Sequence, residues 1–199
     1  MSSITLNDTS DEALLAQYID GDIASFTVLY ERHKGAMYRY LLRQVHDERL
    51  SEDLLQDIWS KIIMHSDGFV AKAKFSTWAY RIARNSLIDH FRHKRVQDSI
   101  IEQFDDTQIG IEQFEKTNEL SFEVDNELQR MRQKKALKRC LEKLPPHLLE
   151  AFLLKEEGNM SGQQISDIID ASYEAVKSRL RYAYQQLRTC LQLNLSINE

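Results

Sequence analysis

The segment SGQQISDIIDASYEAVKSRLRYAYQQLR (residues 161–188) carries the clearest signal for the fold of this chain. Residues 162–169 place three isoleucines on one face of a short helix, which Ser161 can cap. Residues 170–172 are too few for anything but a tight turn. Between residues 173 and 193, apolar side chains return at the spacing of one helix face: Val176, Leu180, Ala183, Leu187 and Leu191. The segment therefore predicts a short helix, a tight turn and a long helix.

This arrangement resembles a helix-turn-helix, whose second helix enters the major groove of DNA. The predicted second helix has a polar face opposite its apolar one, with Glu174, Lys177, Ser178, Arg181, Gln185 and Arg188. Lysine and arginine near the start of such a helix are the usual partners of guanine. A solvated basic face is also common, so this motif alone leaves both interpretations open.

The composition extends the helical prediction to the whole chain. Among 199 residues there are only two prolines and six glycines, which argues against an all-β fold because such folds need frequent turn residues. The hydrophobic fraction of 42% and the charged fraction of 29% are typical of a globular protein. We expect an all-α fold of two small helical domains joined by an acidic flexible linker, with the helix-turn-helix in the second domain.

Charge and periodicity divide the chain into three parts. Residues 1–95 are patterned as helices, and helical patterning returns in residues 128–199, where Pro145-Pro146 starts a new helix. Residues 96–127 contain ten acidic residues and one base, Lys116, with no sustained period. This middle part is expected to be a linker extended by self-repulsion, with short helical pieces at most.

A polar stripe follows the helix that we expect after Ser51, its predicted N-cap. The stripe is formed by Asp53, Gln56, Asp57 and Ser60, at the spacing of one continuous helix face. It is either a solvated outer face or a surface for docking a protein. Trp59 lies beside it and is a candidate anchor, because aromatic residues often lie at the centre of interfaces.

The segment KFSTWAYRIARNSLIDHFRHKR (residues 74–95) is basic, although the chain has a net charge of −5. It holds six Lys or Arg and two His against one acid, Asp89, with four aromatic residues between them. We expect Ser76 or Thr77 to cap its helix, and Trp78 and Phe91 to be able to point inward. One stripe of this helix contains Arg81, Asn85, Ile88, Arg92 and Arg95, with Arg84 beside it. A basic stripe on an acidic protein predicts a polyanion as partner, and the rings suggest exposed bases of a single strand.

Three motifs together resemble one known family, the extracytoplasmic-function branch of the bacterial sigma-70 factors. FSTWAYRIARNSLIDHFRHKR is similar to the family's promoter-melting segment, and SEDLLQDIWSKII to its polymerase-binding segment. LEKLPPHLLEAFLLKEEGNMSGQQISDIIDASYEAVKSRLRYAYQQLR is similar to its promoter-upstream domain. The order and spacing of the three make the resemblance specific. It covers nearly all of the chain outside the linker and the first ten residues.

The resemblance implies a role for each group of residues. The polymerase contact falls on Asp53, Gln56, Asp57 and Trp59. The residues that the resemblance assigns to contact with the promoter −10 element are Trp78, Arg81, Arg84, Asn85, Arg92 and Arg95. The loop at 65–74 matches the family's loop that captures a flipped base. The residues that the resemblance assigns to contact with the −35 element are Glu174, Lys177, Ser178 and Arg181. The family's Gly-Thr is Glu174-Ala175 here, and its turn glycine is absent from Asp170-Ala171, so the −35 sequence cannot be predicted.

Two other classes of protein account for part of these features. A helix-turn-helix regulator that binds duplex DNA without polymerase predicts a dimer on a palindromic operator, but it leaves the polar stripe unexplained. An enzyme could use Asp89, His90 and His93 as metal ligands, but His93 lies among basic residues that repel a cation. No phosphate loop, nucleophile motif or carboxylate pair is present, so we expect a protein without catalysis, metal or cofactor.

The expected partners are core RNA polymerase, promoter DNA and an anti-sigma factor, and the free protein is expected to be a monomer. No apolar run reaches the ~18 residues that span a bilayer, and the N-terminus lacks the order of a signal peptide. We therefore expect a cytoplasmic protein without membrane insertion. Cys140 and Cys190 are far apart in the sequence, and both are expected to be reduced and structural. The promoter, the activating signal and the identity of the anti-sigma factor do not follow from the sequence.

Overall fold

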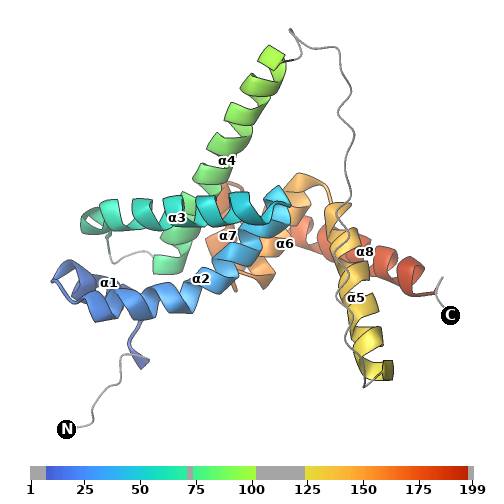
Figure 1. Ribbon diagram of the computed structural model, residues 1–199, viewed down its shortest axis with the longest axis horizontal. Helices are drawn as coiled ribbons and strands as arrows, with labels where there is room; N and C mark the ends of the chain where they lie inside the picture. Colours follow the sequence, from blue (N-terminus) through green and yellow to red (C-terminus); the bar gives the residue numbers. More distant parts are fainter. Residues whose placement is uncertain (1–7, 71–73, 102–123, 197–199) are drawn as a thin grey trace.

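The structure is a computed structural model that describes residues 8–70, 74–101 and 124–196 (Figure 1). These residues form α-helices and one 3-10 turn and contain no strand, in agreement with the expected all-α class. The elements in chain order are α1 (Asp11–Ile19), α2 (Ile23–Val45), α3 (Glu48–Met64), η2 (Ser66–Gly68), α4 (Phe75–Ile101), α5 (Val124–Glu142), α6 (Pro146–Glu156), α7 (Gly162–Ile169) and α8 (Tyr173–Ser196).

The N-terminal unit consists of α1 to α4, in which α2 packs against α1 and α3, and α3 packs against α4. Each helix contributes one apolar face to a shared core. The fully buried side chains include Leu14, Leu29, Met37, Tyr40, Leu41, Ile58, Ile62 and Phe75. The second half of α4 extends away from this bundle (Figure 1).

The C-terminal unit consists of α5 to α8, in which α8 packs against α5, α6 and α7. Its core contains Leu153, Leu154, Ile165, Ile168, Val176 and Ala183. The helix-turn-helix is formed by α7 and α8, as predicted. Ser161 caps α7 in a capping box: its side chain accepts from the Gln164 N–H, and the Gln164 side chain accepts from the Ser161 N–H.

The two units are packed against each other. Helix α7 contacts α4, and α6 contacts α2, so that α6 and α7 lie at the centre of the molecule (Figure 1). The buried apolar residues of both units form one continuous cluster. No local motif indicates this contact, because its partners lie far apart in the chain.

Two predicted helix starts are corrected. Helix α3 begins at Glu48, three residues before Ser51, because His46 takes a left-handed conformation that turns the chain at once and the Asp47 side chain accepts from the Leu50 N–H. Ser51 is buried inside the helix, where its hydroxyl donates to the Asp47 carbonyl at 2.6 Å. Helix α4 begins at Phe75, ahead of the expected caps.

A residue distant in sequence binds the N–H group at the start of α4. The Glu12 carboxylate of α1 accepts from the Phe75 N–H at 2.9 Å. A carboxylate at a helix N-terminus also interacts favourably with the helix dipole. Sequence pattern could not show this, because 63 residues separate the two partners.

Helical residues extend into both ends of the segment expected as a linker, 96–127. Helix α4 continues to Ile101, and α5 begins at Val124. The prediction of an extended, flexible chain between them concerns residues 102–123, which lie outside the described residues.

Candidate nucleic-acid interface

The start of α8 presents a polar face. Glu174, Lys177, Ser178 and Arg181 are all exposed, while Val176 and Ala183 on the opposite face are fully buried. The Lys177 ammonium lies 3.3 Å from a Glu174 carboxylate oxygen. The four side chains predicted for −35 recognition therefore share an open helix face, and Glu174 neutralises part of its positive charge.

Helix α4 carries the residues predicted for the −10 element, but most of its aromatic rings are in the core. Phe75 and Tyr80 are almost completely buried, and Trp78 is half-buried beside Phe69, with ring centroids 5.2 Å apart. Burial raises the pKa of the Tyr80 hydroxyl. Phe75 and Tyr80 hence cannot serve as exposed stacking platforms.

Phe91 corrects another expectation. It was expected to be able to point inward, but it is 39% exposed, at the rim of a pocket that Gln44, Leu144 and Pro146 also line, and its ring centroid lies 5.6 Å from that of His90. The reason is tertiary: residues 88–94 of α4 include no buried side chain, so this part of the helix borders the core without entering it. Phe91 is thus an exposed ring next to the basic stripe.

The basic stripe of α4 divides into two parts. Arg81 and Arg84, in its first half, make contacts with the C-terminal unit. Farther along, Asn85 is exposed, and the Arg92 guanidinium donates to Asp89 at 2.9 Å in an exposed pair. The side chain of Arg95 lies outside the described residues, so its predicted role stays a prediction.

The contacts of Arg81 and Arg84 cross between the two units. Arg84 Nε donates to Glu150 Oε1 of α6 at 2.8 Å, with both side chains largely buried. Arg81 Nη2 donates to the Asp167 carbonyl oxygen at 2.7 Å. That carbonyl belongs to the last turn of α7, where carbonyl groups lack a partner in their own helix and carry partial negative charge.

Sequence reasoning missed a second set of contacts between the units. Glu157, at the end of α6, accepts from Arg39 Nε at 2.6 Å and from Arg43 Nε at 2.9 Å. The partners are 118 and 114 residues apart in the chain, so no local pattern could reveal them.

The polar stripe of α3 is exposed at Asp53, Gln56, Asp57 and Ser60. Asp57 pairs with Lys61 one turn later at 2.7 Å, and both side chains remain accessible. These residues thus form a polar surface on the outer side of the N-terminal unit.

Trp59 does not belong to this exposed surface. The side chain is only 4% exposed and packs edge-on against Phe26 and Tyr30, with ring centroids 5.7 and 5.0 Å away. Trp59 lies on a different side of α3 from the stripe, so its side chain points into the core. The expectation that Trp59 anchors a partner at the surface is therefore corrected. Its ring instead packs α3 against α2 on the buried side of the helix.

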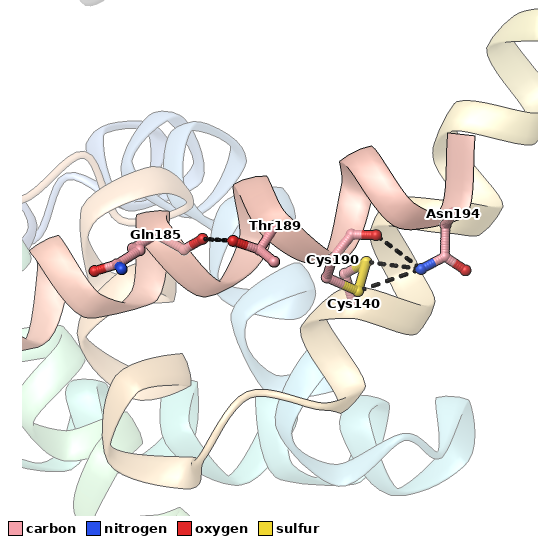
Figure 2. Close-up of a disulfide and its surroundings, with 5 residues drawn as sticks. All are labelled: Cys140, Gln185, Thr189, Cys190 and Asn194. Carbon is pink, nitrogen blue, oxygen red and sulfur yellow. Dashed lines mark hydrogen bonds between the residues drawn. A yellow bond between two sulfur atoms is a disulfide. The ribbon is translucent and has the colours of Figure 1, made fainter. Parts of the chain in front are cut away.

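Cys140 and Cys190 form a disulfide, which corrects the expectation that both are reduced. They join α5 to α8, which pack side by side although the cysteines are 50 residues apart (Figure 2). The Asn194 side-chain amide donates to the Cys190 carbonyl at 2.8 Å and lies 3.4 Å from Cys190 Sγ (Figure 2). A groove of about 650 Å³ adjoins the bond and is lined by both cysteines, Lys143, Tyr182 and Leu193.

Within the described ranges, no group of three or more His, Cys, Asp or Glu side chains could hold a metal ion. None of the helices in the described part of the chain is both long and apolar enough to span a bilayer.

Comparison with known proteins assigns the class. Residues 29–96 match the family model for sigma-70 region 2, and residues 134–187 match the one for sigma-70 region 4. The chain belongs to the sigma-70 family of RNA polymerase sigma factors, in its extracytoplasmic-function branch. Its function is accordingly that of a sigma factor.

Several curated relatives cover most of this chain. RNA polymerase sigma factor SigZ of Bacillus subtilis is 25% identical over 82% of this chain and 85% of its own length. RNA polymerase sigma-H factor of Pseudomonas aeruginosa is 26% identical over 94% of this chain and 96% of its own. The extracytoplasmic-function sigma-E factor of Haemophilus influenzae is 25% identical over 92% and 96%.

Two solved structures share the fold. CnrH, solved in complex with the cytosolic domain of CnrY, matches 93% of this chain and 99% of its own with a TM-score of 0.65 and 22% identity. The sigma factor RpoE of Bartonella quintana, solved with the anti-sigma factor NepR, matches 85% and 98% with a TM-score of 0.64 and 19% identity.

Proposed function

We propose that this sigma factor divides promoter recognition between its two units. Residues 1–95 dock on core RNA polymerase and open the −10 element, residues 96–127 link the units, and residues 128–199 bind the −35 element. The observation that carries the proposal is the position of the polar faces. The stripe of α3 and the start of α8 are exposed, while the opposite faces of these two helices form the core, and residues 88–94 of α4 all remain accessible to solvent.

Docking on polymerase falls to Asp53, Gln56 and Asp57. Their carboxylates and amide are directed outward from a rigid helix and can accept hydrogen bonds from basic groups of a partner. Trp59 fixes the helix from within and makes no direct contact in this proposal. The protein needs no metal or cofactor for this work and carries out no catalysis of its own.

The −10 element is opened by α4. Arg81, Arg84 and Arg92 supply charge for the phosphates of the separated strand, and Asn85 offers a neutral amide to a base edge. Trp78, half-buried against Phe69 at the end of the loop, supports a pocket for one flipped base. Extrusion of a base costs a few kcal/mol of stacking, which these contacts have to offset.

The −35 element is read in the major groove by the start of α8. Lys177 and Arg181 can donate to guanine, whereas Glu174 can accept from the N4 amino group of cytosine. The Lys177 ammonium lies 3.3 Å from a Glu174 carboxylate oxygen, so the two opposite base preferences are adjacent on the helix face.

Two further assignments belong to this proposal. The two similar solved structures are complexes, one with an anti-sigma factor and one with the cytosolic domain of CnrY, which favours an anti-sigma partner for this chain as well. A sigma factor acts on chromosomal DNA, which favours the cytoplasm as the location of this chain. The free protein is proposed to be a monomer.

The proposal is tested on the docking stripe. In the double variant Asp53→Lys, Asp57→Lys, complex formation with purified core polymerase should fall at least tenfold in size-exclusion or interferometry measurements. The matched control, Asp20→Lys with Glu31→Lys, makes the same charge change at exposed positions outside the stripe and should bind normally. Equal binding of both variants and wild type, with unchanged circular dichroism, would show that the stripe is only solvated.

A further inference from the structure

The densest positive charge of the chain lies in α5, a helix that has no assigned contact in the proposed function. Residues 130–143 contain seven Lys or Arg and a single acid, Glu142. The basic segment of α4, residues 74–95, spreads six Lys or Arg over a longer stretch. A chain with a net charge of −5 repels DNA as a whole, so a local cluster of this density predicts a polyanionic partner.

Six of these cations are exposed and have no partner in the structure. Within the described part of the chain, no ion pair, hydrogen bond or ring contact involves the side chains of Arg132, Lys134, Lys135, Lys138, Arg139 or Lys143. Other basic groups differ, since Arg84 binds Glu150 and Lys177 lies beside Glu174. The positive charge of α5 is therefore available to a partner outside the chain.

Four of the six cations share one side of the helix. The α5 stripe, as we name it, follows the spacing i, i+3, i+7, i+11 and consists of Arg132, Lys135, Arg139 and Lys143. On the neighbouring side, Ala136 and Cys140 are buried in the C-terminal unit. At 1.5 Å per residue the stripe is ~16 Å long, which corresponds to about five phosphates of one DNA strand at 3.4 Å each.

The α5 stripe is held firmly on the C-terminal unit. Helix α5 packs along α8, and the disulfide between Cys140 and Cys190 joins the two helices. Lys143, at one end of the stripe, lines the same groove as Gln185, which belongs to the polar face of α8. From there the stripe runs toward the N-terminal end of α5, which extends away from the other helices (Figure 1). A fixed row of cations loses little conformational freedom when it binds a rigid polyanion.

The residue types of the stripe favour duplex DNA over a single strand. Single strands are bound largely by stacking of their bases on aromatic rings, and residues 130–143 contain no aromatic residue. The phosphates of a duplex need only cations at a suitable spacing. This distinguishes α5 from α4, where Trp78 and Phe91 accompany the basic side chains.

We propose that the α5 stripe binds the phosphate backbone of duplex DNA without reading its sequence. It is a second DNA surface of the C-terminal unit, separate from the proposed −35 face of α8. It supplies attraction that the start of α8 lacks, because Glu174 neutralises part of the charge there. The inference goes beyond the proposed function and does not depend on it.

The test compares two double variants of the full chain on a short duplex of random sequence. Lys135→Gln with Arg139→Gln removes two cations of the stripe. The matched control, Lys134→Gln with Lys138→Gln, removes the same charge at the same spacing from exposed positions of the same helix, but outside the stripe. Gln has nearly the same helix propensity as Lys and Arg, so circular dichroism should be unchanged in both variants.

Fluorescence anisotropy over a range of salt concentrations gives the readout. For the stripe variant, the slope of log affinity against log salt concentration should become shallower by about 1.8, because each phosphate contact contributes ~0.9. Its affinity at low salt should fall at least about tenfold for the same reason. The control should retain most of the wild-type affinity and slope.

Two further ligands distinguish duplex DNA from other partners. A single-stranded RNA of the same length should bind the wild-type chain more weakly than the duplex does. Core RNA polymerase should bind the stripe variant as tightly as wild type. A preference for the RNA, or a loss confined to polymerase binding, would assign the stripe to another partner and overturn the proposal.

The proposal is also overturned if wild type does not bind the random duplex, or if the stripe variant and the control lose affinity equally. The second result would mean that only the overall charge of the chain matters. A random duplex contains no −35 element, and the polymerase-docking experiment changes Asp53 and Asp57 instead. Failure of the inference is thus distinguishable from failure of the proposed function.

Discussion

Asp170 adopts a backbone conformation that is unfavourable for a residue with a side chain. The residue ends α7 with φ of 52°, a left-handed conformation that glycine adopts without penalty and other residues adopt at a cost. The turn keeps its shape because Ile168 and Ile169 are buried on one side and α8 begins three residues later. The helix-turn-helix therefore forms without the glycine that the family's usual turn contains.

Asp170→Gly should therefore stabilise the protein by about 0.5–1 kcal/mol, because it relieves this conformation. Urea unfolding followed by circular dichroism measures the change. Ala171→Gly is the control at the next position, where φ is not positive, and it should leave stability unchanged or lower it. A loss of stability in Asp170→Gly would mean that the aspartate side chain contributes more than its backbone strain costs.

At the scale of elements, the disulfide joins the first and last helices of the C-terminal unit. The cysteines enclose α6 and α7 completely and most of α8. Closure of a loop of 50 residues restricts the unfolded chain and corresponds to about 4 kcal/mol in the chain-entropy model. Cys140 and Cys190 therefore link the stability of the C-terminal unit to the thiol–disulfide balance around it.

A reductant should lower the unfolding midpoint of the wild-type protein in urea, by an amount equivalent to up to about 4 kcal/mol. Cys190→Ser cannot form the bond, so its midpoint should match that of the reduced wild type and should not respond to the reductant. Alkylation followed by mass spectrometry counts the thiols in each sample. Equal midpoints for oxidised and reduced wild type would contradict the stabilising role of the bond.

At the scale of the whole molecule, the proposed function separates two steps of initiation between two units. Arg181 lies on the exposed start of α8, and Asn85 is exposed on α4. Arg84 is a poorer probe, since its removal also breaks the pair with Glu150. Arg181 and Asn85 can hence report on the two steps without disturbing the contacts between the units.

Arg181→Ala should weaken the closed promoter complex by about 1–3 kcal/mol and relax preference at one or two upstream base pairs. Asn85→Ala should leave that complex intact and reduce permanganate reactivity of unpaired thymines. A template with a pre-melted −10 bubble should rescue Asn85→Ala, because the cost of unpairing has been removed, and should do little for Arg181→Ala. The promoter is first identified by run-off transcription on genomic DNA, and equal rescue of both variants would refute this division.

Local sequence alone determined most of the helices and which faces of α3 and α8 are polar and exposed. The capping box at Ser161, the spacing of the isoleucines in α7 and the apolar face of α8 are set by residues within one or two turns of one another. The same holds for the exposed stripe of Asp53, Gln56 and Asp57. Periodicity suffices for such features because a helix brings residues three and four apart onto one face.

Only the tertiary structure decided which side chains of those helices are accessible. It placed Trp59 in the core and Phe91 outside it, joined Cys140 to Cys190, and set Arg84 against Glu150. Each of these outcomes depends on a neighbour tens of residues away in the chain. The physical reason is that burial, ion pairing and disulfide formation require proximity in space, which the packing of one helical unit on the other creates and no local pattern contains.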